Sequence, residues 1–474
     1  MLHLSQISFI LPELIIFLSG IFILIYGAFS KTDNFSNINI LALMAILLAG
    51  LSVFFIDDYK SLFNNAFVIT PLAKYIKLLV LIISFFAIYI SYNYLSHNEL
   101  KVFEYPVLLI FSVLGMLIMI SSNDLIMLYI SIELQSLSLY VLVALRRRSI
   151  KASEAALKYF ILGSIASAII LYGSSMIYSV TGATNYNIIS AYSKISDENI
   201  IFSFGIILIL SGIAFKLSAA PFHMWTPDVY EGSPSSVTTI LVTLPKLAAL
   251  TVLINLLFKP FIGQVEVWQP IIIIISVLSM AVGSISALKQ ENLKRLFAFS
   301  TIANIGYVLI GLACVNEDAV QSSLLYIFVY TFGALGVFSF IMILRRDDTQ
   351  LVNISDISGM SKLNPILSLF IAILLLSMAG IPPFGGFFAK LYIFSAAIES
   401  DLLFLAISGV IFSVVSAYYY LKIIKAIYLD EVVEDIASNL DKKQYLIIAF
   451  TSLLMLTFIF YADELIRFIN FIYI

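Results

Sequence analysis

The sequence predicts an all-α membrane protein of about fourteen transmembrane helices, and two observations lead to that fold class. First, the chain of 474 residues is 61% hydrophobic and only 12% charged, with a mean hydropathy of +1.04. Second, apolar runs of roughly 20 residues recur from end to end, and such a run is long enough to span a bilayer as a helix. The whole chain, residues 1–474, is therefore interpreted as one polytopic membrane domain.

Fourteen apolar runs are the candidates for these helices. The first is expected to be a retained helix and not a signal peptide, because Met1–Gln6 has neither a basic region nor a small-residue cleavage site. The run near 363–397 is too long for one straight helix and is interrupted at Gly380–Gly386. In chain order the runs lie near 10–29, 38–56, 76–95, 106–121, 124–145, 157–180, 202–219, 235–258, 270–288, 297–315, 322–344, 363–397, 404–428 and 445–465.

Breaks in the seventh and twelfth runs suggest an internal repeat. Pro221 ends the seventh run and Gly380–Gly386 lies inside the twelfth, and proline and glycine there loosen a helix. Broken helices at matching places in two halves point to an inverted-repeat transporter. Tyr140–Leu142 also recurs as Tyr307–Leu309, at nearly the separation of Pro221 from Pro383. We therefore expect two inverted five-helix repeats, helices 4–8 and 9–13, with helices 7 and 12 broken.

Basic residues predict how the helices are oriented. If the N-terminus lies outside, most lysines and arginines of the loops fall on the inner side, among them Lys31 and Arg146–Arg148. Cytoplasmic loops carry such an excess of basic residues, so both termini are expected outside. A contact of Arg146–Arg148 with lipid headgroups or a partner is the alternative interpretation.

We single out five charged side chains inside apolar runs, where solubility does not require them. A charged side chain at the bilayer centre costs about 2.5–3.5 kcal/mol on insertion scales, so it generally marks an ion or proton path. Charges spread over several helices predict a wet, titratable path through the membrane. They are Glu133, Lys158, Lys216, Lys246 and Lys390.

Each of these charges has a plainer alternative. Glu133 would otherwise be one half of a structural ion pair, and Lys216 would otherwise extend toward the membrane interface. Lys246 lies near the middle of its run, and Lys390 follows the second break, so neither reaches an interface easily. Lys158 lies near the start of its run, where the residues alone favour extension to the interface.

Other polar residues lie near the first break. His223 adjoins it, and a hydrogen-bonding role and a role in proton transfer both remain open. Asp228 and Glu231 follow in what is expected to be a loop, as solvated acids or helix caps.

Several chemistries are excluded. The only cysteine, Cys314, cannot form a disulfide within the chain or hold an iron–sulfur cluster, and is expected to be a small buried hydrophobe. No glycine-rich phosphate loop follows a strand, so no nucleotide site is expected. The net charge of −3 gives no indication of nucleic-acid binding. We expect no cofactor in this chain.

Four segments resemble those of a known family. They are Phe215–Pro234, Asn123–Leu125 with Glu133–Leu137, Gln290–Leu296 and Gly380–Phe387. They are similar to the antiporter-like membrane subunits of proton-translocating NADH–quinone oxidoreductase (respiratory complex I). Multisubunit sodium/proton antiporters share part of these patterns. Thr226–Gly232 and the end of the second segment are closer to the subunit N group.

The resemblance implies a role for each charged position. A glutamate and a lysine would form a pair, and three further lysines and a histidine would pass the proton on. The resemblance also makes Lys158 a functional lysine of the sixth helix, in place of the residue-based interpretation that it extends to the membrane interface. These positions are Glu133 with Lys216, then Lys158, His223, Lys246 and Lys390. Asn304 stands where many members have a histidine. Since asparagine does not titrate near neutral pH, a relay through that position would have to use water.

The resemblance implies a translocase subunit that moves protons and has no redox site of its own. The implied partners are the neighbouring antiporter-like subunit M, small membrane subunits and the lipid bilayer, with no nucleic acid. A bacterial inner (cell) membrane is favoured over the mitochondrial inner membrane. The alternatives are a subunit of a multisubunit sodium/proton antiporter and a structural subunit whose charges tie helices together. Lysines on four helices argue against the last.

Overall fold

The computed structural model describes residues 8–30, 34–195, 199–346, 349–432 and 441–473, and nearly all of these residues are helical. Met1–Gln6 and Lys31, which the sequence interpretation used, lie outside them. The chain forms two compact units. Unit 1 consists of Met1–Leu217 and Leu244–Trp268, and unit 2 consists of Ser218–Thr243 and Gln269–Ile474.

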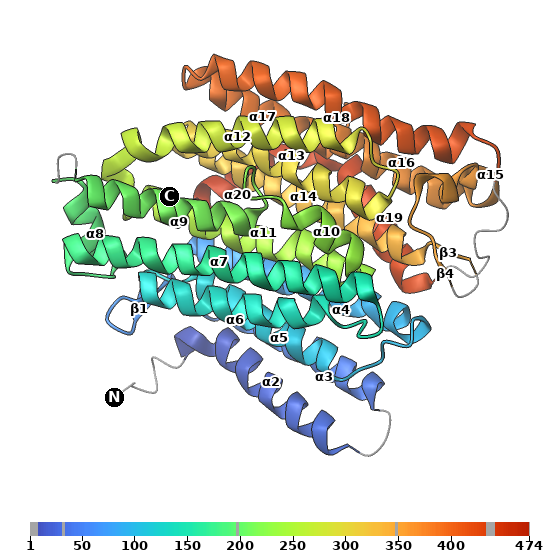
Figure 1. The fold of residues 1–474 in the computed structure, drawn as a ribbon, viewed down its shortest axis with the longest axis horizontal. Coiled ribbons are helices and arrows are strands. Elements are labelled where there is room, and N and C mark those ends of the chain that lie inside the picture. Colours follow the sequence, from blue (N-terminus) through green and yellow to red (C-terminus); the bar gives the residue numbers. More distant parts are fainter. Residues whose placement is uncertain (1–7, 31–33, 196–198, 347–348, 433–440, 474) are drawn as a thin grey trace. The chain divides into compact units, whose positions relative to one another are not determined.

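Unit 1 is built mainly from long helices, and Figure 1 draws them from dark blue to green. Thr70, Asp124 and Ser149 begin three of these helices, since their side chains accept hydrogen bonds from the first free backbone N–H groups. The elements are η1 (Ser8–Ile10), α2 (Leu11–Phe29), α3 (Phe35–Val53), the antiparallel strands β1 (Lys60–Leu62) and β2 (Phe67–Ile69), α4 (Pro71–His97), α5 (Glu104–Ile120), α6 (Leu125–Val143), α7 (Ile150–Thr181), α8 (Tyr186–Ser193), α9 (Ile200–Leu217) and η2 (Ile262–Gln264).

Two helices belong to both units. α11 (Ser235–Phe258) continues from unit 2 into unit 1 at Leu244, and α12 (Val265–Ala287) returns to unit 2 after Trp268. The remaining elements of unit 2 are α10 (Trp225–Gly232), α13 (Leu293–Ala313), α14 (Glu317–Ile343), the antiparallel β3 (Arg345–Arg346) and β4 (Thr349–Gln350), η3 (Ile354–Ile357), α15 (Met360–Leu363), α16 (Pro365–Ala379), α17 (Gly385–Glu399), α18 (Leu403–Leu429), α19 (Lys442–Leu456), η4 (Phe458–Phe460) and α20 (Ala462–Tyr473).

The all-helical membrane class that the sequence predicts is confirmed. Within the described part of the chain, eleven helices are long and apolar enough to cross a bilayer, and α5 and α16 are shorter apolar helices. Every predicted run falls on a helix, and the run near 363–397 divides into α16 and α17 at the predicted break. The total of fourteen spans and the inverted repeat stay predictions.

Some elements differ from the prediction. The run near 445–465 is not one helix, because α19 ends at Leu456 and α20 begins at Ala462. Between them the Tyr461 hydroxyl donates a hydrogen bond to the Leu454 carbonyl, which holds the turn closed. The segment expected as a loop after the first break contains the short helix α10. At 8 residues, α10 is too short to contain the long apolar run by which a helix is recognised from sequence.

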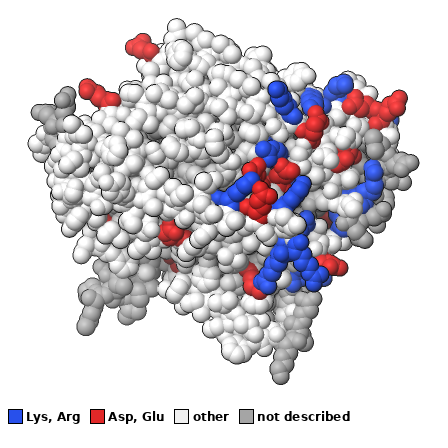
Figure 2. Space-filling view, viewed as in Figure 1, with Lys and Arg blue, Asp and Glu red and all other residues white. Residues whose placement is uncertain are grey.

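The outer surfaces of both units are apolar, as a chain surrounded by lipid requires. Large side chains such as Phe29, Phe55 and Leu429 are exposed, and Figure 2 shows a broad surface with few charged groups. A water-soluble monomer rarely exposes such a large continuous apolar area. The lipid-facing side chains therefore account for the high hydropathy of the sequence.

Within unit 1, α7 and α9 pack closely along glycines. A Cβ atom at Gly173 would lie 2.8 Å from the Gly205 carbonyl oxygen, and one at Gly212 would lie 2.9 Å from the Ala166 oxygen. Small residues let helix backbones approach in membranes, where apolar burial alone does not drive helices together. The glycines thus set the distance between these two helices.

A leucine at Gly173 should separate α7 from α9. Overpacking of this kind costs about 1–3 kcal/mol, so Gly173→Leu should lower the thermal unfolding temperature of the detergent-purified protein. Gly50→Leu is the matched control, because nothing lies within 4 Å of a Cβ atom there. Equal stability of the two variants would contradict this account of the packing.

Candidate functional site

The first helix break supplies a backbone acceptor for a buried lysine. α9 ends at Leu217, where Ser218 adopts a left-handed conformation with a φ of 64°. The last carbonyls of a helix have no partner within it. Lys246, on α11 and 0% exposed, donates a hydrogen bond to the Lys216 carbonyl oxygen at 3.0 Å. The break therefore solvates an ammonium group that water does not reach.

Lys216 itself lies in a polar cluster against α6. Its Nζ donates to Ser136 Oγ at 2.7 Å and lies 5.9 Å from the centre of the Tyr140 ring. Glu133 precedes Ser136 by one helical turn, so the carboxylate and the hydroxyl share a face of α6.

Glu133 acts on Lys216 without a direct hydrogen bond. The carboxylate is close enough to attract the ammonium electrostatically, yet its buried Oε1 has no hydrogen-bond partner among the described residues. The hydroxyl of Ser136 takes the bond that sequence reasoning assigned to the carboxylate. In this arrangement the two residues therefore interact through electrostatic attraction and not through a hydrogen-bonded ion pair.

The second break surrounds Lys390 in a similar way. α16 ends at Ala379, and Gly380 follows with a φ of 83°, a conformation that favours glycine. The Lys390 Nζ donates to the Ala379 oxygen at 3.0 Å and to Ser413 Oγ at 2.9 Å. It also lies 4.9 Å from the centre of the Tyr307 ring. A Cβ atom at Gly380 would lie 2.8 Å from Lys390 Cδ, so glycine also makes room for this side chain.

Lys158 and His223 lie outside these clusters. Lys158 pairs with Glu154 one turn away on α7, at 2.7 Å, and its side chain is 42% exposed. His223 is half-buried beyond α9, and its Nδ1 is buried with no hydrogen-bond partner in the described part of the chain. The proton-transfer roles of both residues stay predictions.

Asn304 is held by protein groups on α13 and α14. Its Oδ1 accepts a hydrogen bond from the Tyr326 hydroxyl at 2.7 Å, and its Nδ2 donates to the Ser300 carbonyl at 2.8 Å. Both ends of the amide are thus satisfied by hydroxyl and backbone groups, with no lysine, histidine or carboxylate among these partners.

Sequence reasoning missed a buried ion pair in unit 1. Lys77 was not among the charges singled out, yet it lies in the second turn of α4, 1% exposed and 2.6 Å from Glu13 of α2. The ammonium also lies 4.7 Å from the centre of the Phe67 ring. The signal available was Glu13 within the first apolar run, which has no reason to be there unpaired.

The expectation for Asp228 and Glu231 is corrected as well. Both lie on α10, and Arg295 of α13 binds them through Nη1, at 2.7 Å and 3.2 Å. Lys294 reinforces this contact by donating to the Ser233 carbonyl at 2.7 Å. These acids therefore lie on a helix and fix α10 against α13, while their side chains stay partly exposed, at 33% and 28%.

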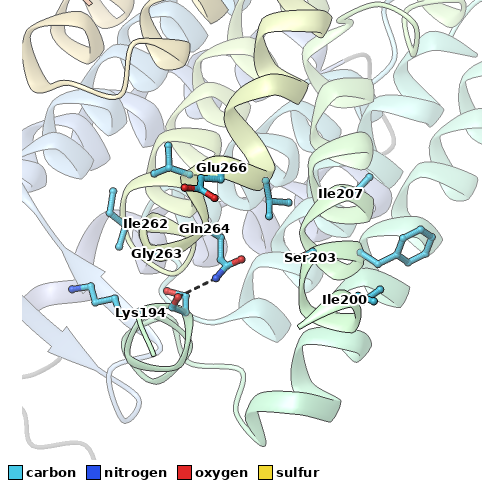
Figure 3. Close-up of a pocket in the computed structure, with 12 residues that line it drawn as sticks. Lys194, Ile200, Ser203, Ile207, Ile262, Gly263, Gln264 and Glu266 are labelled. Atoms are coloured by element: carbon cyan, nitrogen blue, oxygen red, sulfur yellow. Dashed lines mark hydrogen bonds between the residues drawn. The ribbon is translucent and has the colours of Figure 1, made fainter. Parts of the chain in front are cut away.

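Unit 1 also contains an open pocket of about 1170 Å³. Figure 3 shows it between the α8–α9 segment and the start of α12, with the Gln264 side chain donating to the Ser193 carbonyl at 3.2 Å. Among the described residues its charged lining groups are Lys194 and Glu266, and none of the intramembrane charges singled out from the sequence lines it. The pocket is therefore separate from the lysine clusters.

Comparison with known proteins assigns the fold to a described family. The family "NADH:quinone oxidoreductase/Mrp antiporter, TM" matches residues 122–416, a range that includes both helix breaks. The chain is 45% identical over 471 residues to NADH-quinone oxidoreductase subunit N of Pelagibacter ubique, covering 98% of this chain and 99% of the relative. It is 40% identical over 457 residues to subunit N of Parvibaculum lavamentivorans, covering 96% and 95%.

Solved structures agree with this assignment. A chain of respiratory complex I from Thermus thermophilus with bound aureothin matches with a TM-score of 0.81 and 25% identity, over 96% of this chain and 98% of that one. A chain of the Mrp complex from Dietzia sp. DQ12-45-1b matches with a TM-score of 0.87 at 19% identity, over 99% and 97%. The second match shows the fold alone.

The Glu13–Lys77 pair should be more sensitive to loss of one partner than to loss of both. Glu13→Gln leaves a buried ammonium without its counter-charge, at a cost of about 3–5 kcal/mol, whereas an apolar pair of similar volume is often tolerated. We expect Glu13→Gln to lower the thermal unfolding temperature strongly, and Glu13→Leu with Lys77→Met to restore most of it. A double variant less stable than Glu13→Gln would refute this reading.

Proposed function

The chain belongs to the NADH:quinone oxidoreductase/Mrp antiporter family, in its subunit N group, and on that premise we propose that it translocates protons as a membrane subunit of a bacterial NADH–quinone oxidoreductase. The observation that carries the proposal is that Lys246 and Lys390 are buried and donate to carbonyls at the ends of interrupted helices. Dipoles hold an ammonium without committing it to a fixed counter-ion, which suits a group that must gain and lose a proton.

The proposed path starts near the first break. Water from the inner side protonates Lys216, and Glu133 stabilises the cation while it stays close. Movement of Glu133 away favours release of the proton to Lys246, directly or through His223. Because no hydrogen bond joins the Glu133 carboxylate to Lys216, only a small displacement is needed.

In the second half of the path, the proton passes from Lys246 to Lys390 and leaves on the outer side. Lys158 would belong to the uptake side of the path. A site at Asn304 would hold the surrounding groups in place instead of carrying the proton, since an amide does not titrate near neutral pH.

The energy for translocation would come from redox reactions in other subunits, because the sequence offers one cysteine and no nucleotide-binding loop. The proposed neighbours are antiporter-like subunit M and small membrane subunits, within a bacterial cell membrane. Both termini would face outward, and fourteen spans would contain the two inverted repeats. A sodium/proton antiporter complex has the same fold, but the subunit N relatives match at about twice the identity of its chain. Proteins that co-purify with this chain would distinguish the two assemblies.

Replacement of Lys246 tests the central step. Lys246→Ala should abolish the proton translocation that depends on this subunit, because no other buried amine replaces the acceptor on α11. The measurement is NADH-driven proton uptake by inverted membrane vesicles, with assembly of the complex checked by native electrophoresis. Lys259→Ala, just beyond the end of α11, is the control and should pump normally. Normal pumping by an assembled Lys246→Ala complex would remove this residue from the path.

Replacement of Glu133 tests whether its charge or its shape matters. Glu133→Gln removes the charge that stabilises protonated Lys216, so pumping should fall sharply. Glu133→Asp keeps the charge and shortens the side chain by one methylene, so pumping should fall less. The same vesicle assay compares the two, and equal losses would show that geometry, not charge, controls this step.

A further inference from the structure

A row of hydroxyl groups leads away from Lys390 between α13 and α18, and the path described above does not use it. On α18 the row contains Ser413, Ser416 and Tyr420, which follow one another at intervals of three and four residues. On α13 it contains Ser300 and Tyr307, seven residues apart. Such spacings place each set on one face of its helix. Apolar helices need no such polar face for their own stability.

The contacts along this row begin at Lys390. Its Nζ donates to Ser413 Oγ at 2.9 Å, and the Tyr307 hydroxyl lies beside the same serine. Tyr307 is 3.5 Å from Ser416 Oγ. At the far end Tyr420 and Ser300 share a hydrogen bond of 2.6 Å between their hydroxyl oxygens.

One hydroxyl lies between the two ends of the row. Tyr419 is fully buried, and its hydroxyl, which lies beside Ser416 and Tyr420, has no hydrogen-bond partner within the described residues. Its ring is 4.4 Å from that of Tyr420. Buried hydroxyls are normally hydrogen-bonded, so the position of this one calls for an explanation other than static stability.

We infer that these hydroxyls conduct protons between Lys390 and Ser300, with Tyr419 as the movable link that closes the row; the inference rests on the proposed function. A hydroxyl both donates and accepts, so each group passes on its own proton as it receives another. One proton enters at one end and one leaves at the other, with no change in oxidation state. Lys390 thereby exchanges protons along α13 as well as with Lys246.

Asn304 acts here as a positioning residue. Its Nδ2 donates to Ser300 Oγ at 3.3 Å and lies 3.4 Å from the Tyr420 hydroxyl. One N–H of this amide bonds the Ser300 carbonyl, so the other is shared between the Ser300 and Tyr420 oxygens as a weaker, bifurcated hydrogen bond. With that N–H on their lone pairs, the two hydroxyls direct one of their own protons into the bond that they share. The amide thus orients this end of the row without carrying a proton.

Tyr419→Phe separates conduction from structure. Phenylalanine keeps the ring and removes a hydroxyl that makes no hydrogen bond, so the thermal unfolding temperature of the complex should stay the same or rise. Conduction predicts that the assembled variant nevertheless pumps clearly fewer protons per NADH oxidised than the unchanged complex. Tyr420→Phe should show the same loss.

Tyr330→Phe is the matched control. Tyr330 is also a buried tyrosine, and it donates to Thr301 Oγ1 of α13 at 2.8 Å, off the row. It should keep normal pumping, measured as NADH-driven proton uptake by vesicles that contain the whole complex. The inference is overturned if Tyr419→Phe pumps normally, or if Tyr330→Phe loses as much as Tyr420→Phe. Normal pumping by Tyr419→Phe together with loss in Lys246→Ala would refute the hydroxyl row and leave the proposed function intact.

Discussion

The hydrogen bonds from buried ammonium groups to carbonyls at broken helix ends are the interactions on which this structure depends. Lys246 and Lys390 are taken out of water, and an isolated charge in an apolar interior is expensive. An unbroken helix has no carbonyl to offer, because each is bonded four residues along the same helix. The interruptions after Leu217 and Ala379 leave backbone carbonyls without an intrahelical partner, within hydrogen-bonding distance of the two lysines. Each buried lysine therefore depends on its helix break for a hydrogen-bond acceptor.

That constraint explains how the surrounding elements are built. Gly380 ends α16 in a left-handed conformation and leaves space for the Lys390 side chain. At the other break, α10 follows within a few residues and is held to α13 by Arg295. The Arg295 contacts thus fix the segment that follows the first break, and Gly380 shapes the second.

The sequence predicts the parts of this structure that depend on composition and on position along the chain. Apolar runs locate the helices, and proline with glycine locates the division of α16 from α17. The i, i+4 spacing of Glu154 and Lys158 was also available, although the pair was not anticipated. The sequence patterns do not predict contacts between segments that are far apart along the chain. Lys246 bonds a backbone carbonyl, which every residue type has, so no residue type identifies this partner in the sequence. The partner of Asp228, Arg295, lies far along the chain. The Lys77 pair was overlooked because the counter-charge, Glu13, belongs to another helix.

The length of α7 gives the exposed Lys158 a natural location. At 1.5 Å per residue its 32 residues extend for about 48 Å, whereas the hydrocarbon layer is about 30 Å thick. An upright α7 centred in the bilayer would project about 9 Å past each boundary of that layer. Lys158 is about 12 Å from the start of the helix, which is only slightly below the boundary. Its ammonium and the carboxylate of Glu154 would then lie among phospholipid headgroups, where a partly exposed ion pair remains hydrated.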